Sequence, residues 1–157
     1  MSVLDDEKPA VWVHPPYLML AVFISGFALR VGVGGHLPLP RVLGEGLGTA
    51  LIILAIVLIQ LAVATFVDGG EELRPPTPSR QLFTKGLYAR TRNPIYLAML
   101  LLGAGIGFAT LNLWTLILTA LAGVVLFYFV IKPEEHYLEE RFGEDYQAYT
   151  KQVRRWF

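Results

Sequence analysis

Long apolar runs alternate with short polar segments along this chain. Four runs are almost free of charged residues and cover residues 17–33, 47–67, 95–111 and 113–131. A transmembrane helix needs roughly 17–25 apolar residues, so all four are long enough, the first and third only just. Lipid offers the backbone no hydrogen-bond partners, so each run must be helical. The pattern predicts an all-α polytopic membrane protein with four transmembrane helices.

The third and fourth runs are separated only by Asn112, which predicts a tight helical hairpin. We expect one membrane domain over the 157 residues. Its parts are an N-terminal segment with two spans (1–67), a loop (68–94), the hairpin (95–131) and a tail with short helices (132–157).

Composition agrees with a membrane protein. Hydrophobic residues make up 54% of the chain and charged residues only 17%, against about a quarter charged in soluble domains. The formal net charge of zero argues against nucleic acid as a partner, because nucleic-acid binding calls for a basic face. Cysteine is absent, which excludes disulfides, thiolate nucleophiles and cysteine metal ligands.

Basic residues predict the orientation. They gather in the loop and in the tail, as Arg74, Arg80, Lys85, Arg90, Arg92, Lys132, Arg141, Lys151, Arg154 and Arg155. In the connection 34–46, Arg41 is the only lysine or arginine. With four spans, the loop and the tail lie on one side, which the positive-inside rule makes cytoplasmic. We therefore expect both termini in the cytoplasm.

The loop and the tail also hold most of the polar chemistry. Prolines at 75, 76 and 78 favour an extended path, Gly86 a turn, and Asn93-Pro94 the start of the third span. In the tail, Pro133 and Gly143 frame one short helix, on which Leu138 and Phe142 share a face. A second helix is expected from Glu144 or Asp145, with the apolar stripe Tyr146, Tyr149 and Val153. These helices either lie in the membrane interface or help to form a binding site, and in both cases Trp156 and Phe157 are expected to act as interfacial anchors.

Three charged residues lie near the predicted membrane surface. Glu134 and Glu135 follow the last span closely, where carboxylates lose solvation and usually have a partner or a function. They are either a helix start favoured by the helix dipole or acceptors for hydroxyl or ammonium groups of a ligand. Arg92, at the mouth of the third span, either reaches toward lipid headgroups or clamps a carboxylate or phosphate.

Two other patterns predict no separate site. Glycines at 103, 105 and 107 lie within the third span, where close helix packing through Gly103 and Gly107 is expected rather than a nucleotide-binding loop. His136 and Glu140 are four residues apart, but nothing supplies further ligands, so no metal site is predicted.

Two longer motifs resemble a known family. The segment from Gly86 to Tyr96 reads G-x-Y-x3-R-N-P-x-Y, and the segment from Glu134 to Val153 reads E-E-x2-L-x3-F-G-x2-Y-x2-Y-x3-V. Both resemble the corresponding motifs of the isoprenylcysteine carboxyl methyltransferase and phospholipid methyltransferase family of integral membrane enzymes. The resemblance covers about half of the chain, from Thr77 to Val153.

The resemblance implies transfer of a methyl group from S-adenosyl-L-methionine to a lipophilic or membrane-borne acceptor, through its oxygen, nitrogen or sulfur. It implies a small bacterial-type member in the inner membrane. It also implies cofactor contacts from Gln81, Leu82, Phe83, Tyr88, Asn93, Pro94, Ile95, Tyr96, Glu134 and Glu135. Arg92 and Asn93 are the candidates for a catalytic or orienting role.

Two positions depart from the prenylcysteine branch. Asn93 stands where that branch has histidine, so it can position groups but cannot take up a proton. Val130 stands where that branch has an arginine that serves the substrate. Both differences argue against prenylcysteine as the acceptor. Two rival functions stay open, an NADPH-dependent reductase of the related sterol-reductase type and a non-catalytic membrane binding protein.

Overall fold

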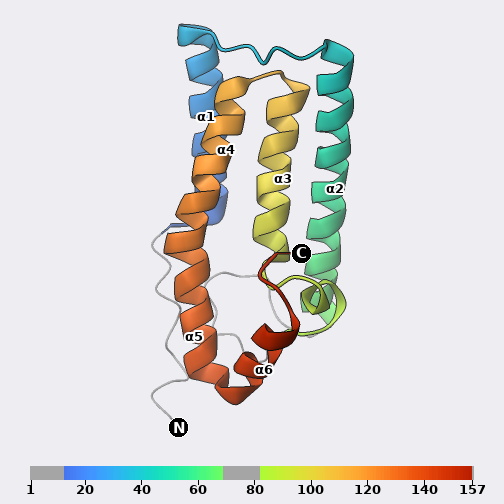
Figure 1. Ribbon diagram of the computed structural model, residues 1–157, viewed down its shortest axis with the longest axis vertical. Helices are drawn as coiled ribbons and strands as arrows, with labels where there is room; N and C mark the ends of the chain where they lie inside the picture. Colours follow the sequence, from blue (N-terminus) through green and yellow to red (C-terminus); the bar gives the residue numbers. More distant parts are fainter. Residues whose placement is uncertain (1–12, 69–81, 157) are drawn as a thin grey trace.

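The fold is a bundle of long helices with a smaller helical lobe at one end (Figure 1). A computed structural model describes residues 13–68 and 82–156. The elements within these ranges are α1 (Pro15–Val33), α2 (Arg41–Asp68), the short 3-10 helix η2 (Gly86–Ala89), α3 (Pro94–Ala109), α4 (Leu113–Leu126), the π-helical turn η3 (Phe127–Ile131), α5 (Lys132–Phe142) and α6 (Glu144–Gln152). The all-α prediction is confirmed.

Side chains on the outside of the bundle are apolar. Leu20, Ile24 and Phe27 of α1 are more than half exposed, as are Leu121 and Val124 of α4. In water such a surface would be strongly unfavourable, whereas hydrocarbon tails solvate it well. The bundle is therefore suited to a lipid bilayer.

The structure supports three spans by length and composition, and the third predicted run is shorter. Among the described residues, Pro15–Val33, Arg41–Thr65 and Leu113–Phe142 are long and apolar enough to cross a membrane. Helix α3 has only 16 residues, because it ends at Ala109 and Leu111 takes a left-handed conformation with φ 51°. At 1.5 Å per residue it extends about 24 Å, less than the ~30 Å hydrocarbon core.

The order of helices across the bundle differs from their order in the chain. Helix α1 packs on α4, α4 on α3, and α3 on α2, so the predicted hairpin lies between the first two helices (Figure 1). Asn112 fixes the hairpin turn. Its side-chain oxygen accepts hydrogen bonds from the backbone of Trp114 and Thr115, and its amide donates to the Gly26 carbonyl at 3.0 Å.

Glycines allow the helices to approach closely. A Cβ added at Gly103 would lie 2.6 Å from the hydroxyl of Thr119 on α4, and one at Gly107 would lie 2.5 Å from Leu116. The predicted packing role of this glycine pair is confirmed. Gly105 serves the other neighbour, because a Cβ there would lie 3.0 Å from the carbonyl of Gly48 on α2.

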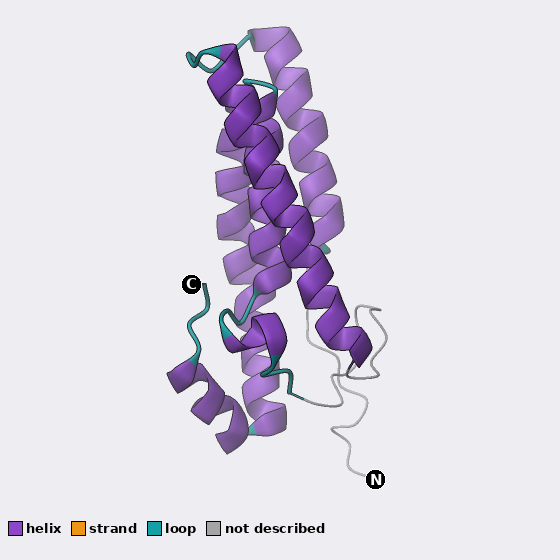
Figure 2. Ribbon diagram, turned by 90° about the vertical axis from the view of Figure 1, so that its right-hand side faces the viewer, coloured by secondary structure: helices purple, strands orange, loops and turns teal. Residues whose placement is uncertain are grey.

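The first tail helix is confirmed as α5, with Pro133 in its first turn and Gly143 just after its end, but it continues from α4 and η3 without a break. A proline inside a helix removes one backbone donor, and the wide π-helical turn just before it accommodates the change. The second tail helix is confirmed as α6, which folds back beside α5 below the bundle (Figure 2).

The contact between α2 and α3 gives a first prediction. Gly48→Ala would push a methyl group onto the backbone of Ala109 and the carbonyl of Gly105, so we expect a loss of about 1–3 kcal/mol in the free energy of unfolding. Gly46→Ala is the matched control, because a Cβ there meets nothing within 4 Å. It should be neutral, or stabilise by up to about 1 kcal/mol through helix propensity. Thermal unfolding in detergent measures both, and equal effects would contradict the packing role of Gly48.

Candidate functional site

The candidate site lies where the loop before α3 meets α5, α6 and the end of the chain. The 3-10 helix η2 brings the loop close to α2, because Gly86 has φ 59° and a Cβ there would lie 2.8 Å from the Thr65 hydroxyl. Glycine is thus required both by backbone conformation and by space. The turn leaves the side chain of Tyr88 buried.

Asn93 and Pro94 start α3 in an unusual way. Pro94 occupies the first helical turn, where its missing N–H costs nothing. Asn93 precedes it with φ −128° and ψ 55°, and its side chain makes no capping hydrogen bond. The Asn93 amide nitrogen is buried without a hydrogen-bond acceptor, although asparagine is normally a good capping residue. Its amide is therefore available to a ligand.

The π-helical turn η3 orients the two glutamates. It contains one extra residue per turn, which rotates everything after it by about 100° relative to a regular helix. Val130 and Ile131 are almost fully buried, whereas Tyr128 and Phe129 face outward. Glu134 and Glu135, three and four residues after the end of the turn, then contact Tyr96 at the start of α3 and Arg92 of the loop.

Glu134 joins α5 to α3. Its Oε2 accepts a hydrogen bond of 2.9 Å from the Tyr96 hydroxyl. Burial raises the pKa of the Tyr88 phenol, and the nearby Glu134 carboxylate raises it further. Two tyrosines and one carboxylate thus form a cluster between the loop, α3 and α5.

Glu135 is held by two arginines. Arg155 binds it in a bidentate manner, with Nε at 2.9 Å and Nη2 at 2.7 Å, and Arg92 places Nη1 at 3.1 Å from Oε1. The side chains of Arg92 and Glu135 are only 14% and 17% exposed. A pair so shielded is stronger than a surface ion pair, and losing one partner leaves a poorly solvated charge.

The end of the chain returns to the loop. The Arg92 N–H donates to the Arg154 carbonyl at 3.1 Å, and the Thr91 hydroxyl donates to the Arg155 carbonyl at 3.0 Å. Figure 1 shows the terminus next to the lower end of α3. Residues 154 and 155 therefore form one wall of the site.

Helix α6 provides an apolar base. Tyr146, Tyr149 and Val153 form a buried cluster with Leu82, Leu138 and Phe142. The Tyr149 hydroxyl donates to the Tyr88 carbonyl at 2.6 Å, which ties α6 to η2. The predicted apolar stripe and the shared face of the first tail helix are confirmed, and both are covered by the loop.

Unpaired polar atoms concentrate in this region. Among the described side chains, the buried nitrogen and oxygen atoms without a hydrogen-bond partner are Arg92 Nε, Asn93 Nδ2, Tyr137 Oη and Thr119 Oγ1. The first two come from the site, and Tyr137 follows Glu134 by three residues on the same helix face. Buried polar atoms are normally paired, so such a group indicates where a ligand binds.

The structure brings most of the predicted residues together. Tyr96 meets Glu134, Arg92 meets Glu135, and the rings of Phe83 and Tyr88 lie 6.2 Å apart. Pro94 is buried and Ile95 half-buried at the start of α3. Leu82 instead packs against the apolar base that α6 provides. Gln81 lies outside the described residues.

Several residues of the site were not predicted. Thr91, Tyr137, Tyr149 and Arg155 contribute contacts or unpaired atoms. The sequence places Arg155 only in a basic tail, although an arginine near a terminal aromatic pair can also pack on a ring. Its guanidinium does lie 4.9 Å from the Phe127 ring centre. Trp156 is half-buried, and Phe157 lies outside the described residues.

Comparison with known proteins identifies the family. The sequence profile of the phospholipid methyltransferase family matches residues 44–145, which include η2, the hairpin and both glutamates. This chain belongs to the phospholipid methyltransferase family. An uncharacterized protein from Haemophilus influenzae is 40% identical over 70 residues, an alignment that covers 40% of this chain and 98% of that protein. Family and apolar helices together indicate an integral membrane protein of the methyltransferase class.

The bond between Tyr149 and Tyr88 gives a second prediction. Tyr149→Phe leaves a buried carbonyl without its donor, so we expect a loss of about 1–2 kcal/mol in the free energy of unfolding. Tyr128→Phe is the matched control, because Tyr128 is 56% exposed. Its effect should stay within about 0.5 kcal/mol. Thermal unfolding in detergent compares the two, and an equally small effect of both would contradict the role of the Tyr149 hydroxyl.

Alkaline pH provides a third prediction. Burial is the largest cause that raises the pKa of Tyr149 to about 12, and nearby Arg92 opposes it. In the unfolded chain the same phenol titrates near about 10. The neutral phenol therefore stabilises the fold fully below pH ~10, and this contribution is lost as the pH rises through ~12. The difference in melting temperature between wild type and Tyr149→Phe should shrink over this window, and a constant difference would contradict the assignment.

Proposed function

We propose that this protein transfers the methyl group of S-adenosyl-L-methionine to a lipophilic acceptor in the membrane. The observation that carries the proposal is the meeting of the loop and α5. There, Glu134 and Tyr96 form a hydrogen-bonded pair beside two buried donors without an acceptor, Arg92 Nε and Asn93 Nδ2. Membership of a methyltransferase family supports the same reading.

The side chains present suit this cofactor. Its carboxylate and adenine nitrogens need hydrogen-bond donors, which Arg92 Nε and Asn93 Nδ2 offer. Its ribose hydroxyls and ammonium need an acceptor, which Glu134 offers. Aromatic faces such as those of Phe83, Tyr88 and Tyr96 favour a sulfonium cation. We propose the contact set Gln81, Leu82, Phe83, Tyr88, Asn93, Pro94, Ile95, Tyr96, Glu134 and Glu135, with Leu82 acting through the packing of α6.

The roles of the charged residues differ. When bound, the cofactor supplies an activated methyl group, so the protein mainly aligns the reactants and excludes water. Arg92 is held in place by its ion pair with Glu135, and its Nη1 lies 3.4 Å from the Tyr146 hydroxyl. A guanidinium fixed in this way is suited to bind the carboxylate of the cofactor. Asn93 has an unpaired amide and is the better candidate to orient a ligand. The site thus aligns and shields more than it moves protons.

The two reactants are expected to reach the site by different routes. The site lies at the end of the bundle that carries the basic tail, so by the positive-inside rule we propose that it, and both termini, face the cytoplasm. A soluble cofactor enters from water on this side. The acceptor, which is lipophilic, enters from the bilayer along the apolar outer surface. In a bacterial cell this arrangement corresponds to the inner membrane.

A fourth prediction tests the cofactor site. S-adenosylmethionine and S-adenosylhomocysteine should bind the purified protein in calorimetric titration. Glu134→Gln replaces one carboxyl oxygen by an NH2 group that cannot accept a hydrogen bond, so affinity should fall by about ten- to a hundredfold. Glu140→Gln is the matched control on the same helix, where the carboxylate is 63% exposed. Its affinity should match that of wild type.

The rival functions give different outcomes. A reductase would be stabilised against heat by NADPH but not by S-adenosylhomocysteine, since a ligand that binds only the folded state raises its melting temperature. A non-catalytic protein would leave a membrane lipid extract unlabelled when given cofactor with a labelled methyl group. Equal cofactor affinity in Glu134→Gln and wild type would overturn the site assignment alone.

A further inference from the structure

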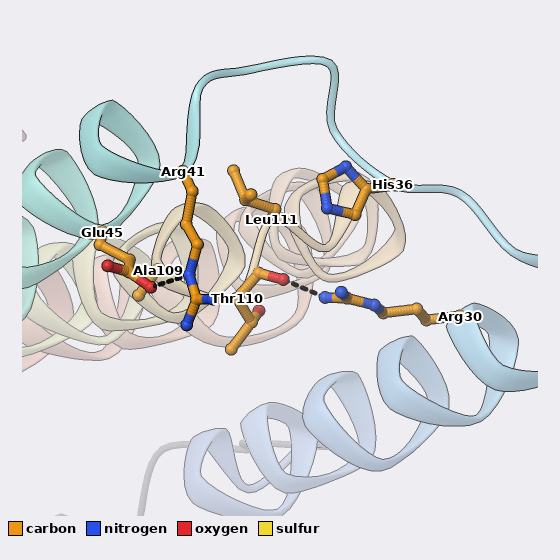
Figure 3. Close-up of a pocket in the computed structure, with 7 residues that line it drawn as sticks. All are labelled: Arg30, His36, Arg41, Glu45, Ala109, Thr110 and Leu111. Carbon is orange, nitrogen blue, oxygen red and sulfur yellow. Dashed lines mark hydrogen bonds and ion pairs between the residues drawn. The ribbon is translucent and has the colours of Figure 1, made fainter.

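A second polar region lies at the opposite end of the bundle, where the α1–α2 connection crosses the hairpin turn. It is a cavity of about 280 Å³ (Figure 3), lined by Arg30, His36, Arg41, Glu45, Ala109, Thr110 and Leu111. Its walls come from the end of α1, the start of α2 and the turn after α3. Backbone hydrogen bonds hold this region together, among them Leu37 N–H to Leu111 O at 2.9 Å.

The cavity carries a net positive charge. Arg30 donates to the Thr110 carbonyl, and Arg41 Nε donates to Glu45 at 2.6 Å. Two guanidinium groups against one carboxylate leave an excess of one positive charge among the arginines and the glutamate. A guanidinium has five N–H donors, so each arginine retains donors for a further acceptor. Arg41 is also the first residue of α2, where the helix dipole favours an anion.

The helix ends that carry the two arginines also expose apolar side chains. Val31 and Val33 at the end of α1 and Val42 and Leu43 at the start of α2 are strongly exposed. A cationic cavity between such helix ends suits an amphiphile, with an anionic head among the arginines and hydrocarbon along the helices. A purely aqueous anion would leave these apolar side chains uncovered.

We propose that this cavity binds the phosphodiester headgroup of a membrane phospholipid, in the leaflet opposite to the end that carries α5 and α6. A phosphodiester has one negative charge, which balances the excess in the cavity. Planar guanidinium groups match phosphate oxygens with paired hydrogen bonds. The acyl chains lie against the exposed valines and leucine at the adjoining ends of α1 and α2. The site stands independently of the methyltransferase proposal.

Native mass spectrometry of the detergent-purified protein, titrated with phosphatidylglycerol, tests the site. Wild type should retain one lipid, and Arg30→Gln with Arg41→Gln should bind it about tenfold more weakly. Arg41→Gln alone should also weaken binding. This single variant is expected to fold normally, because the Arg41 side chain is 83% exposed. Lys151→Gln, an exposed position on α6, is the control and should bind as wild type does.

Two further ligands separate the possible sources of binding. Diacylglycerol, which has the chains but no phosphate, should not displace phosphatidylglycerol, and glycerol 3-phosphate, which has the phosphate but no chains, should not either. Displacement by glycerol 3-phosphate would overturn the proposal in favour of a soluble phosphate ligand. Undiminished lipid binding in both arginine variants, or equal binding of diacylglycerol, would overturn it outright.

Discussion

The ion pairing of Glu135 with two arginines is the interaction on which the arrangement of the loop, α5 and the end of the chain depends. Arg92 comes from the loop, Glu135 from α5 and Arg155 from the end of the chain, so one carboxylate connects three segments. Charges at a membrane surface lose much of their hydration and are stable only when they are paired. The requirement to pair this carboxylate brings the chain end back against the loop and closes the candidate site on that side.

A second constraint comes from proline within a long helix. Pro133 cannot donate a backbone hydrogen bond, and the π-helical turn before it absorbs the defect without ending the helix. The turn also rotates Glu134 toward Tyr96. A regular helix would present a different face to the loop. A local irregularity thus sets the direction of the side chains of the candidate site, and π-helical turns are frequent at such positions.

The two ends of the bundle carry different kinds of polar side chains. The end with α6 collects carboxylates, tyrosines and unpaired donors, which suits a polar ligand with several functional groups. The other end presents arginines around a cavity and is fastened by Asn112. Between them the helices expose apolar side chains, and glycines allow α3 to lie close to both α2 and α4. The two candidate sites thus lie at opposite ends of one apolar bundle.

The sequence by itself determined the membrane character, the helical runs, the hairpin at Asn112 and the family motifs, because these follow from composition and from neighbouring residues. It also located α6 and its stripe of Tyr146, Tyr149 and Val153, since helical periodicity is local. Tertiary structure decided the rest. The short end of α3 depends on the backbone of Leu111 at the turn, and the unbroken path through Pro133 on its packing. The partnership of Arg155 with Glu135 joins residues 20 positions apart across a fold, and the cavity of Arg30 and Arg41 exists only where three separate segments meet. No periodicity encodes such contacts, because they arise from the whole chain packing at once.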